Sequence, residues 1–318
     1  MNEEMEITDS RNTESYRFSV FTATFNRGNM LKNVYEDLLN QTFKDFEWVI
    51  VNDGSSDNTD EVIKGFIADK KIDILYIKKE NGGKHTAWRA ATPLFHGLYE
   101  IGADDDDRHS PQMLEIFDRN WHILETGGHN LYDSFWEIRA RVQDETGKLV
   151  GPKFDSYFDS DYNEFCYKLG YGTLECDGCR KVSVLQKEAA VPDNILFDSE
   201  IQNYSECLRW SKAARKYKTR YIPDVVRTYV YTQVSLCRQK GNKRKYYTGL
   251  VESIYLINEQ KDLMMRYNKK TLIMKYLNVA YQGVRLKKIF LSPLHRFIDK
   301  VSVMCMVPIA VALYVIRK

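Results

Sequence analysis

The sequence has 318 residues, of which 43% are hydrophobic and 28% are charged, and its formal net charge is +2. This composition is typical of a globular protein and excludes a disordered or fibrous chain. The length is sufficient for one large domain or two smaller domains, each with its own hydrophobic core.

The charge is distributed unevenly along the chain. Residues 238–318 contain 17 Lys and Arg but only 4 Asp and Glu, whereas the preceding residues contain 29 basic and 40 acidic side chains. An acidic front followed by a basic end indicates an anionic partner on one side of the molecule. The basic end lacks a recognisable nucleic-acid-binding module, so we expect no nucleic acid partner.

The N-terminal half alternates between strand-like and helix-like segments. Residues 1–16 are polar and acidic, and we predict a mobile tail there without a secretory leader. Beyond the tail, four strands alternating with three helices predict βαβ units and a mostly parallel central sheet with flanking helices. The predicted strands are 18–23, 46–51, 72–77 and 98–103, and the predicted helices are 30–39, 59–67 and 84–95.

The second half is less regular. A helix is predicted over 113–124, short β-like pieces over 131–190, a helix over 201–210 and an extended segment over 221–231. Beyond residue 241 the chain becomes helical and basic. We therefore predict a tail at 1–16, an α/β domain at 17–237 and a basic helical C-terminal region at 238–318, which ends in an apolar segment.

Four successive carboxylates, Asp104 to Asp107, follow the strand predicted at 98–103. They repel one another, so a fold keeps them together only on a solvated face or around a cation. Oxygen ligands suit Mg²⁺ or Mn²⁺, and ligands of α/β sheets bind at the carboxyl ends of strands. A metal site and a solvated acidic turn are both compatible with the pattern.

Other site motifs are absent or weak. No G-x-G-x-x-G follows the first strand and no G-x₄-G-K-[ST] occurs, so neither a dinucleotide-binding motif nor a P-loop is supported. Cys176 and Cys179 form a single C-x-x-C without the further ligands of a zinc site. We predict that both are reduced structural thiols.

The order and spacing of four blocks resemble family 2 glycosyltransferases, which use nucleotide sugars and have the GT-A fold. The resemblance covers roughly residues 17–235, and the subgroup that it most resembles makes bacterial surface polysaccharides. The blocks are residues 22–27, 51–57, 81–87, and 104–107 with Pro111 behind them.

The resemblance implies a nucleotide site at the strand ends. Residues Ala23, Thr24 and Phe25 would pack on the nucleobase, and Asp53 would accept a hydrogen bond from it. Lys84 follows a glycine turn near a predicted helix start, a location that suits anions, and could therefore face the nucleotide. Asp104 and Asp105 would lie near the ribose and the metal waters. Asp106 is the implied direct ligand of Mn²⁺ or Mg²⁺, with Asp104 as a second ligand. The family's D-x-D motif corresponds to Asp104–Asp106. Its middle residue here is Asp105, whereas family members more commonly have a small residue at that position.

The resemblance also implies a general base and contacts to the diphosphate. Glu206 matches the position of the base best, with Glu200 and Asp198 as alternatives. Arg227 and Arg238 flank a tyrosine-rich segment that resembles the family's loop over the diphosphate, and either could contact phosphate. An ordinary exposed arginine is the alternative for both.

The implied function is inverting sugar transfer from a nucleoside-diphosphate sugar, UDP-linked by default, to a hydroxyl of a glycan or lipid-linked acceptor in polysaccharide biosynthesis. A metal-dependent phosphohydrolase would also use aspartates at strand ends. A non-catalytic scaffold of the same fold that binds carbohydrate or lipid is the third possibility. The sequence identifies neither the sugar nor the acceptor.

The apolar segment at 301–316 contains sixteen residues without a charge, fewer than the roughly 20 that span a bilayer. Pro308 interrupts it, and basic residues precede it. An anionic membrane surface attracts such a pattern, so we predict peripheral contact with the inner face of the membrane and a catalytic domain in the cytoplasm. A buried helix and an oligomer contact are the alternatives, and the oligomeric state is not predicted. The preceding basic residues are Arg285, Lys287, Lys288, Arg296 and Lys300.

Overall fold

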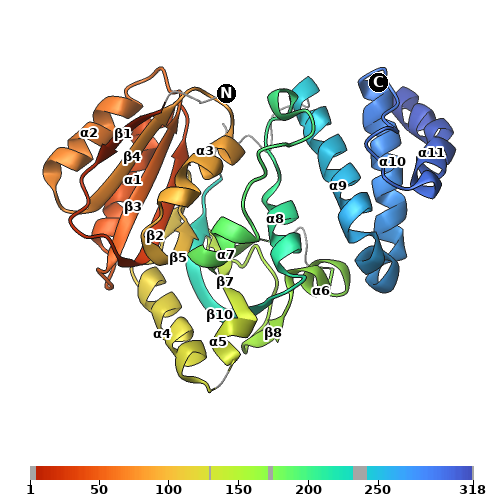
Figure 1. Ribbon diagram of the computed structural model, residues 1–318. Helices are drawn as coiled ribbons and strands as arrows, with labels where there is room; N and C mark the ends of the chain where they lie inside the picture. Colours follow the sequence, from red (N-terminus) through yellow and green to blue (C-terminus); the bar gives the residue numbers. More distant parts are fainter. Residues whose placement is uncertain (1–4, 129, 171–174, 232–241, 317–318) are drawn as a thin grey trace. The chain divides into compact units, whose positions relative to one another are not determined.

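The computed structural model describes residues 5–128, 130–170, 175–231 and 242–316 (Figure 1). The chain divides into two compact units: Met1–Asp161, Thr173–Val191 and Ala213–Arg238 form the first, and Tyr162–Gly172, Pro192–Lys212 and Gln239–Lys318 form the second. The sequence predicts one domain over 17–237. Two stretches inside that range join the C-terminal helices instead, because their apolar side chains, such as Tyr167 and Leu208, belong to the core of the second unit.

A mixed sheet of ten strands organises the described part of the first unit. Its strand order is β1-β4-β3-β2-β5-β9-β7-β10-β6, and β8 pairs with β10. The neighbours among β2, β3, β4 and β5 are parallel, as are β7 and β10, and the remaining pairs are antiparallel. The strands are β1 (Glu6–Asp9), β2 (Tyr16–Thr24), β3 (Phe46–Asp53), β4 (Asp73–Lys79), β5 (Gly97–Gly102), β6 (Arg108–His109), β7 (Phe135–Asp144), β8 (Phe158–Ser160), β9 (Cys176–Lys181) and β10 (Lys218–Tyr229).

The strand order reverses beside β2. The chain moves from β2 outward to β3 and β4, and then returns to the other side of β2 as β5. Open parallel α/β sheets bind ligands at the carboxyl ends of their strands next to such a reversal. The topology therefore predicts a ligand site near the residues after Thr24 and after Gly102, where β2 and β5 end.

Helices cover both faces of this half of the sheet. The apolar stripes of α1, α2 and α4 share one core with alternate residues of the strands, including Leu31, Ile63 and Phe117. On the other face, the Trp88 ring of α3 lies 4.3 Å from the Phe21 ring between their centroids. The helices of this unit are α1 (Gly28–Leu39), α2 (Thr59–Asp69), α3 (Lys84–Ala91) with the 3₁₀ turn η1 (Thr92–Leu94), α4 (Met113–Thr126), α5 (Leu131–Ser134) and α7 (Val182–Lys187).

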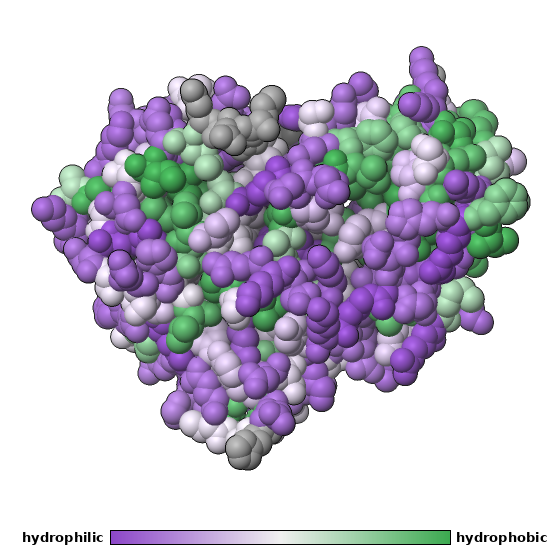
Figure 2. Space-filling model, viewed as in Figure 1, coloured by the Kyte–Doolittle hydropathy of each residue, from purple (hydrophilic) through white to green (hydrophobic). Residues whose placement is uncertain are grey.

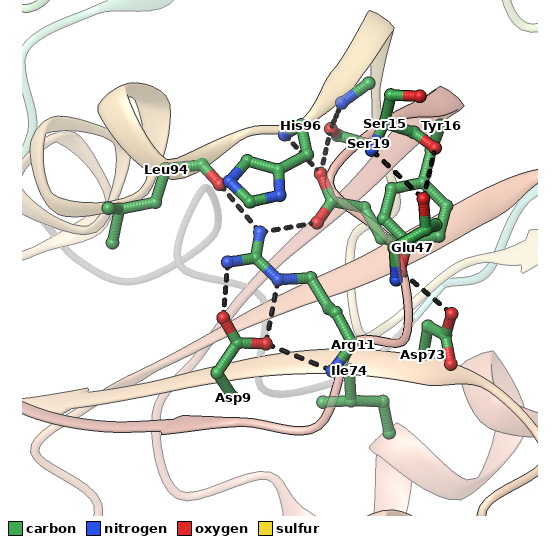
Figure 3. A network of polar contacts seen from close by, with 12 residues as sticks. Asp9, Arg11, Ser15, Tyr16, Ser19, Glu47, Asp73, Ile74, Leu94 and His96 are labelled. Atoms are coloured by element: carbon green, nitrogen blue, oxygen red, sulfur yellow. Dashed lines mark hydrogen bonds and ion pairs between the residues drawn. The ribbon is translucent and has the colours of Figure 1, made fainter.

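The N-terminal segment is joined to the sheet, which differs from the tail predicted for residues 1–16. Glu6–Asp9 form the edge strand β1, antiparallel to β4. The Arg11 guanidinium donates hydrogen bonds to the buried Glu47 carboxylate at 2.8 Å and to the Leu94 carbonyl at 2.9 Å (Figure 3). Glu47 also accepts a hydrogen bond from the Ser19 hydroxyl. A buried carboxylate requires such partners, so Arg11 fixes this segment to β3 and to the turn η1.

The second unit is helical. Its apolar residues form a separate core that includes Ile254 of α9, Val279 of α10 and Val303 of α11. In the described part of the chain, α11 is the one helix long and apolar enough to cross a membrane. The helices of this unit are α6 (Tyr162–Tyr167), η2 (Asp198–Glu200), α8 (Glu206–Ala213), α9 (Lys243–Tyr267), α10 (Lys269–Arg285) and α11 (Phe297–Ile316).

Candidate active site

The loops that follow β2 and β3 are hydrogen-bonded to each other. The Asn26 backbone N–H donates to the Ser55 hydroxyl at 2.9 Å, and the Asn26 side-chain oxygen accepts from the Ser56 backbone N–H at 2.7 Å. Asn26 has a φ of 54°, a left-handed conformation that asparagine tolerates better than most residues. The carboxyl ends of the two strands are thus held together before any ligand binds.

Asp53, the last residue of β3, is buried and fixes the loop before α3. Its Oδ1 accepts hydrogen bonds from Lys79 Nζ and from the Gly82 backbone N–H, both at 3.0 Å. Its Oδ2 accepts from the Gly83 backbone N–H at 2.7 Å. A carboxylate has roughly four acceptor positions, so Asp53 retains capacity for one further donor.

Asp105 joins the end of β2 to the turn after β5. Its Oδ2 accepts a hydrogen bond from the Thr24 hydroxyl at 2.8 Å, and its Oδ1 accepts from Arg27 Nη1 at 2.6 Å. The same Arg27 nitrogen lies 3.1 Å from Oδ2 of Asp106. Burial raises the pKa of Asp105 to about 6, although Arg27 and Thr24 oppose the shift. The acidic turn is therefore anchored at the point where the strand order reverses.

Asp104 is paired with Lys84, the first residue of α3. Lys84 Nζ donates to Asp104 Oδ1 at 2.7 Å, and about a third of each side chain is exposed. Burial would raise the pKa of Asp104, but the positive charges of Lys84 and Arg227 outweigh it and lower the pKa to about 2. Asp104 is therefore an ionised carboxylate at neutral pH, and Lys84 lies at the acidic turn.

Asp107 lies in the interior of the unit. Its Oδ2 accepts a hydrogen bond from Arg227 Nη1 at 2.7 Å, and its Oδ1 accepts from the Val230 backbone N–H at 3.2 Å. The other Arg227 nitrogen, Nη2, donates to Glu175 at 3.1 Å. Burial raises the pKa of Asp107 to about 7, with Asp104 adding to the shift and Arg227 opposing it. Asp107 thus connects the acidic turn to β10.

The four carboxylates divide into two that are buried and two that are accessible. The side chains of Asp105 and Asp107 are 4% and 3% exposed, and both oxygens of each accept hydrogen bonds. The side chains of Asp104 and Asp106 are 39% and 24% exposed. Phe25, after the end of β2, presents a ring that is 46% exposed. An acidic pair and an aromatic surface are therefore accessible at the same sheet edge.

Arg227 is not the ordinary exposed arginine that the sequence offered as the alternative to a diphosphate contact, and that contact stays a prediction. Its guanidinium is buried and bonded to Asp107 and Glu175. Burial would lower the pKa of Arg227, but four surrounding carboxylates raise it. The physical reason is that buried acidic groups need a counter-charge, which sequence position does not reveal. Arg238, the other predicted contact, lies outside the described residues.

The three candidate bases belong to the second unit, whereas the acidic turn belongs to the first. Glu206 is the half-buried first residue of α8. Asp198 and Glu200 lie in η2, and the Glu200 carboxylate is 3.6 Å from Lys243 Nζ. The choice among the three therefore remains a prediction.

Arg27 has a place in the site that the sequence does not reveal. It belongs to the first motif block, but its charge partners are 78 and 79 residues away along the chain. Arg27 and the two aspartates each follow a predicted strand, and the carboxyl ends of adjacent parallel strands lie at the same edge of a sheet. This shared edge is the signal that could have suggested the pairing.

Cys179 is a buried thiol that accepts a hydrogen bond from the Trp121 indole at 3.1 Å, consistent with a structural role.

The mixed sheet with its reversed strand order has the GT-A fold of glycosyltransferases of known structure. The crystal structure of S. aureus TarS 1-349 has the same fold: its TM-score is 0.56 at 15% identity, over 85% of this chain and 80% of that chain. The TarS complex with UDP-GlcNAc gives a TM-score of 0.53 at 16% identity, over 85% of this chain and 73% of that chain.

The family is identified by sequence. Residues 19–169, just under half of the chain, match the sequence model for Glycosyl transferase family 2, and this part of the chain belongs to that family. An uncharacterised glycosyltransferase of Escherichia coli (strain K12), YibD, is 23% identical over 287 residues, which cover 85% of this chain and 78% of that relative.

Two further relatives match over shorter ranges. Glycosyltransferase GlyA of Streptococcus pneumoniae is 34% identical over 185 residues, covering 57% of this chain. The hyaluronan synthase of Pasteurella multocida is 34% identical over 110 residues, covering 35% of this chain. The matched regions are only 26% and 11% of those relatives, so their similarity concerns the catalytic fold and not the whole proteins.

Proposed function

We propose that this glycosyltransferase transfers a sugar with inversion from a nucleoside-diphosphate sugar, UDP-linked, to a hydroxyl of a glycan or lipid-linked acceptor in polysaccharide biosynthesis. One observation carries the proposal: Asp104 and Asp106 are accessible where the strand order reverses, and buried partners fix the turn that holds them. The TarS neighbours that bind UDP and UDP-GlcNAc, and the hyaluronan synthase relative, support the donor and the product class.

The nucleotide would lie along the carboxyl ends of β2 and β3. The Phe25 ring and Ala23 would contact the base, and the remaining acceptor position of Asp53 would take a donor from it. The Lys84 ammonium, which donates a hydrogen bond to Asp104, would also donate to the diphosphate, because an ammonium group has three donors. The protein thus supplies both apolar contact and charge.

Asp104 and Asp106 fit a divalent cation. Both are oxygen donors with one carboxylate oxygen that takes no described hydrogen bond, whereas Asp105 and Asp107 have none to spare. No group of three metal-binding side chains exists among the described residues, which suits a cation that takes one or two carboxylates and completes its shell with substrate phosphates. Bound Mn²⁺ or Mg²⁺ would stabilise the charge on the leaving diphosphate.

The transfer itself requires one proton acceptor. The acceptor oxygen forms a bond to the anomeric carbon, the bond from that carbon to the diphosphate oxygen breaks, and the electron pair leaves with the nucleoside diphosphate. The acceptor hydroxyl gives its proton to a carboxylate, for which Glu206 is the proposed base. Attack opposite the leaving group inverts the configuration at that carbon.

Calorimetric titration with nucleoside diphosphates, each with and without Mn²⁺, tests the donor site. We expect UDP to bind more tightly than other nucleoside diphosphates, and Mn²⁺ to strengthen its binding in the natural protein but not in Asp106→Ala. Asp224→Ala is the control, because Asp224 is a partly exposed carboxylate paired with Arg119 on the surface.

A product assay with UDP-sugars completes the test. Release of UDP together with a glycosylated acceptor supports transfer. Release of inorganic phosphate would indicate a phosphohydrolase, and binding without turnover of any UDP-sugar would indicate a scaffold; either result contradicts the proposal.

A further inference from the structure

Helix α11 exposes a continuous apolar stripe. The helix spans the 20 residues Phe297–Ile316, whereas the apolar segment in the sequence contains sixteen uncharged residues. Only 17% of the most apolar 18-residue stretch of this helix is buried. Within residues 301–316, the last that the structure describes, every exposed side chain is uncharged. The exposed positions recur every three or four residues, so they share one side of the helix. The largest are Val301, Met304, Ile309, Val311, Val315 and Ile316.

The opposite side of α11 is held within its own unit. Val303 and Ala310, seven residues apart, are fully buried. Asp299 is also buried, and its carboxylate accepts hydrogen bonds from Lys261 of α9 and, at 2.6 Å, from Tyr276 of α10. This fixed inner side determines which face of the helix points outward. An outward apolar face contrasts with ordinary surface helices, whose outer side is polar.

The region of the chain that ends in α11 is basic. Residues 242–316 contain 13 Lys and Arg but only 4 Asp and Glu, and the exposed side chains of Lys287, Lys288 and Arg296 lie just before α11 along the chain. Hydrophobic colour gathers over the C-terminal helices, at the right of Figure 2, beside strongly hydrophilic residues. A second copy of this chain would carry the same positive charge and repel it, whereas an anionic surface complements it.

We propose that the outward stripe of α11 docks on an anionic lipid bilayer. The apolar side chains would enter the boundary between headgroups and acyl chains, and the adjacent lysines and arginine would contact lipid phosphates. This inference concerns where the enzyme works and does not rest on the proposed transfer reaction.

The packing of α11 favours a helix that lies in the membrane surface. If α11 crossed the bilayer, it would either separate from α10 and expose the Asp299 carboxylate, or draw α10 and its lysines into the membrane. A carboxylate and a lysine ammonium are both costly in hydrocarbon. A helix that lies parallel to the surface keeps its inner contacts and inserts only its outer side.

A groove at the start of α11 suits one acyl chain. Its volume is about 460 Å³, and it is lined by Leu291, Phe297, Lys300, Val301, Met304 and Cys305. Lys300 is the one charged residue in this lining, so a lipid chain in the groove would have an ammonium group near its headgroup phosphate.

Flotation of the full chain with vesicles tests the proposal. We expect binding to an equal mixture of phosphatidylcholine and phosphatidylglycerol, weak binding to phosphatidylcholine alone, and loss of binding at high salt. Ile309→Glu should weaken binding about tenfold or more, since it places a carboxylate in the stripe next to anionic lipid. Ile123→Glu is the matched control, because Ile123 of α4 is 48% exposed and Ile309 is 49% exposed.

Two further variants separate the contributions. The double variant of Lys287→Ala and Lys288→Ala should weaken binding to the anionic vesicles without changing binding to neutral ones. Val315→Glu, at a position that is 66% exposed, repeats the stripe test if Ile309→Glu does not fold.

Three results would overturn the docking surface. Absence of binding to anionic vesicles, or unchanged binding of a folded stripe variant, would exclude the stripe as a lipid contact. A concentration-dependent dimer in light scattering that Ile309→Glu abolishes would instead assign the stripe to a second copy of the chain.

Discussion

Arg227 of β10 donates a 2.7 Å hydrogen bond to the carboxylate of Asp107, which lies 120 residues earlier in the chain. Both side chains are at least nine-tenths buried. This pair connects the turn that carries the accessible carboxylates Asp104 and Asp106 to the far half of the sheet. The position of the candidate metal ligands therefore depends on an ion pair that contains neither of them.

Removal of Arg227 is expected to destabilise the first unit. In Arg227→Met, the Asp107 and Glu175 carboxylates lose their shared counter-charge, and an uncompensated buried charge typically costs about 3–5 kcal/mol. Urea denaturation should show this loss in the free energy of unfolding. Asp107→Asn in the same background should recover part of it, since the stranded charge is then removed.

Arg119 provides the control for this measurement. It forms an ion pair with Asp224 at 3.1 Å, but its side chain is 60% exposed. Arg119→Met should change the free energy of unfolding by no more than about 0.5 kcal/mol. Equal effects of the two arginine variants would contradict a structural role for the Arg227 pair.

Lys181 should make stability depend on pH in the alkaline range. Its ammonium lies 3.2 Å from the centroid of the Tyr132 ring, and burial lowers its pKa to about 8, opposed by Asp133 and Glu125. Below pH 8 both the folded and the unfolded chain carry the proton, so the penalty for the buried charge is fully present. As the pH rises above 8, the folded state loses the proton first and the penalty disappears.

The comparison with Lys181→Met isolates this effect. The natural protein should gain stability relative to the variant between pH 7 and pH 10, by less than about 1.4 kcal/mol per pH unit because solvent screens the group partly. Urea denaturation of both proteins at each pH measures the difference. A difference that stays constant between pH 7 and pH 10 would show that Lys181 has an ordinary pKa, and a difference that shrinks as the pH rises would show that its pKa is raised.

Sequence patterns predict most of the parallel part of the sheet, β2 to β5, and its helices. The strand over Phe46–Asp53 is buried at every position, and its nearly continuous apolar run indicates this in advance. Asp104 to Asp107 can also be located, because they follow an apolar strand directly. These features depend on residues that are neighbours in sequence, where periodicity and turn chemistry are informative.

Sequence patterns do not predict features that depend on partners far away along the chain. The polar strand Glu6–Asp9 exists because it pairs with β4, and Asp299 of α11 is buried because it bonds to Lys261 and Tyr276. The burial of Arg227 likewise depends on Asp107. Charged residues are ordinarily exposed, so a sequence pattern assigns each of them to the surface.

Asp106→Ala should abolish sugar transfer while the fold survives. Asp106 is 24% exposed, and its partner Arg27 remains bonded to Asp105, so the loss of one carboxylate leaves the turn anchored. Loss of a contact that stabilises charge in the transition state typically lowers the rate about 10²-fold or more. Initial rates with Mn²⁺ present, together with thermal melting, test both parts.

The surface variant Asp224→Ala serves as the control for Asp106→Ala and should retain full activity. Near-normal transfer by Asp106→Ala in saturating Mn²⁺ would exclude Asp106 as a metal ligand. A large drop in melting temperature would show that it is structural.

Arg27→Met should weaken the use of donor without abolishing it. The Arg27 guanidinium lies between the Asp105 and Asp106 carboxylates, and without it these two charges repel and the turn loses its position. Misplacement of a positioned group costs catalysis even when the group itself is present. We expect kcat/KM for the donor to fall about tenfold or more. Unchanged donor kinetics would show that the other bonds to the turn hold it in position without Arg27.

Glu206→Gln should separate binding from chemistry. The amide keeps the size of the carboxylate but cannot accept the acceptor's proton, so donor affinity should be unchanged while kcat falls about 10²- to 10⁴-fold. Calorimetry with UDP and initial rates on the same preparation measure the two quantities. Glu200→Gln is the matched control, because Glu200 lies on the same unit and its carboxylate is 45% exposed, 3.6 Å from Lys243. If Glu206→Gln loses affinity for UDP, Glu206 is structural. If Glu200→Gln or Asp198→Asn alone loses turnover, the base lies in η2, one segment earlier in the chain.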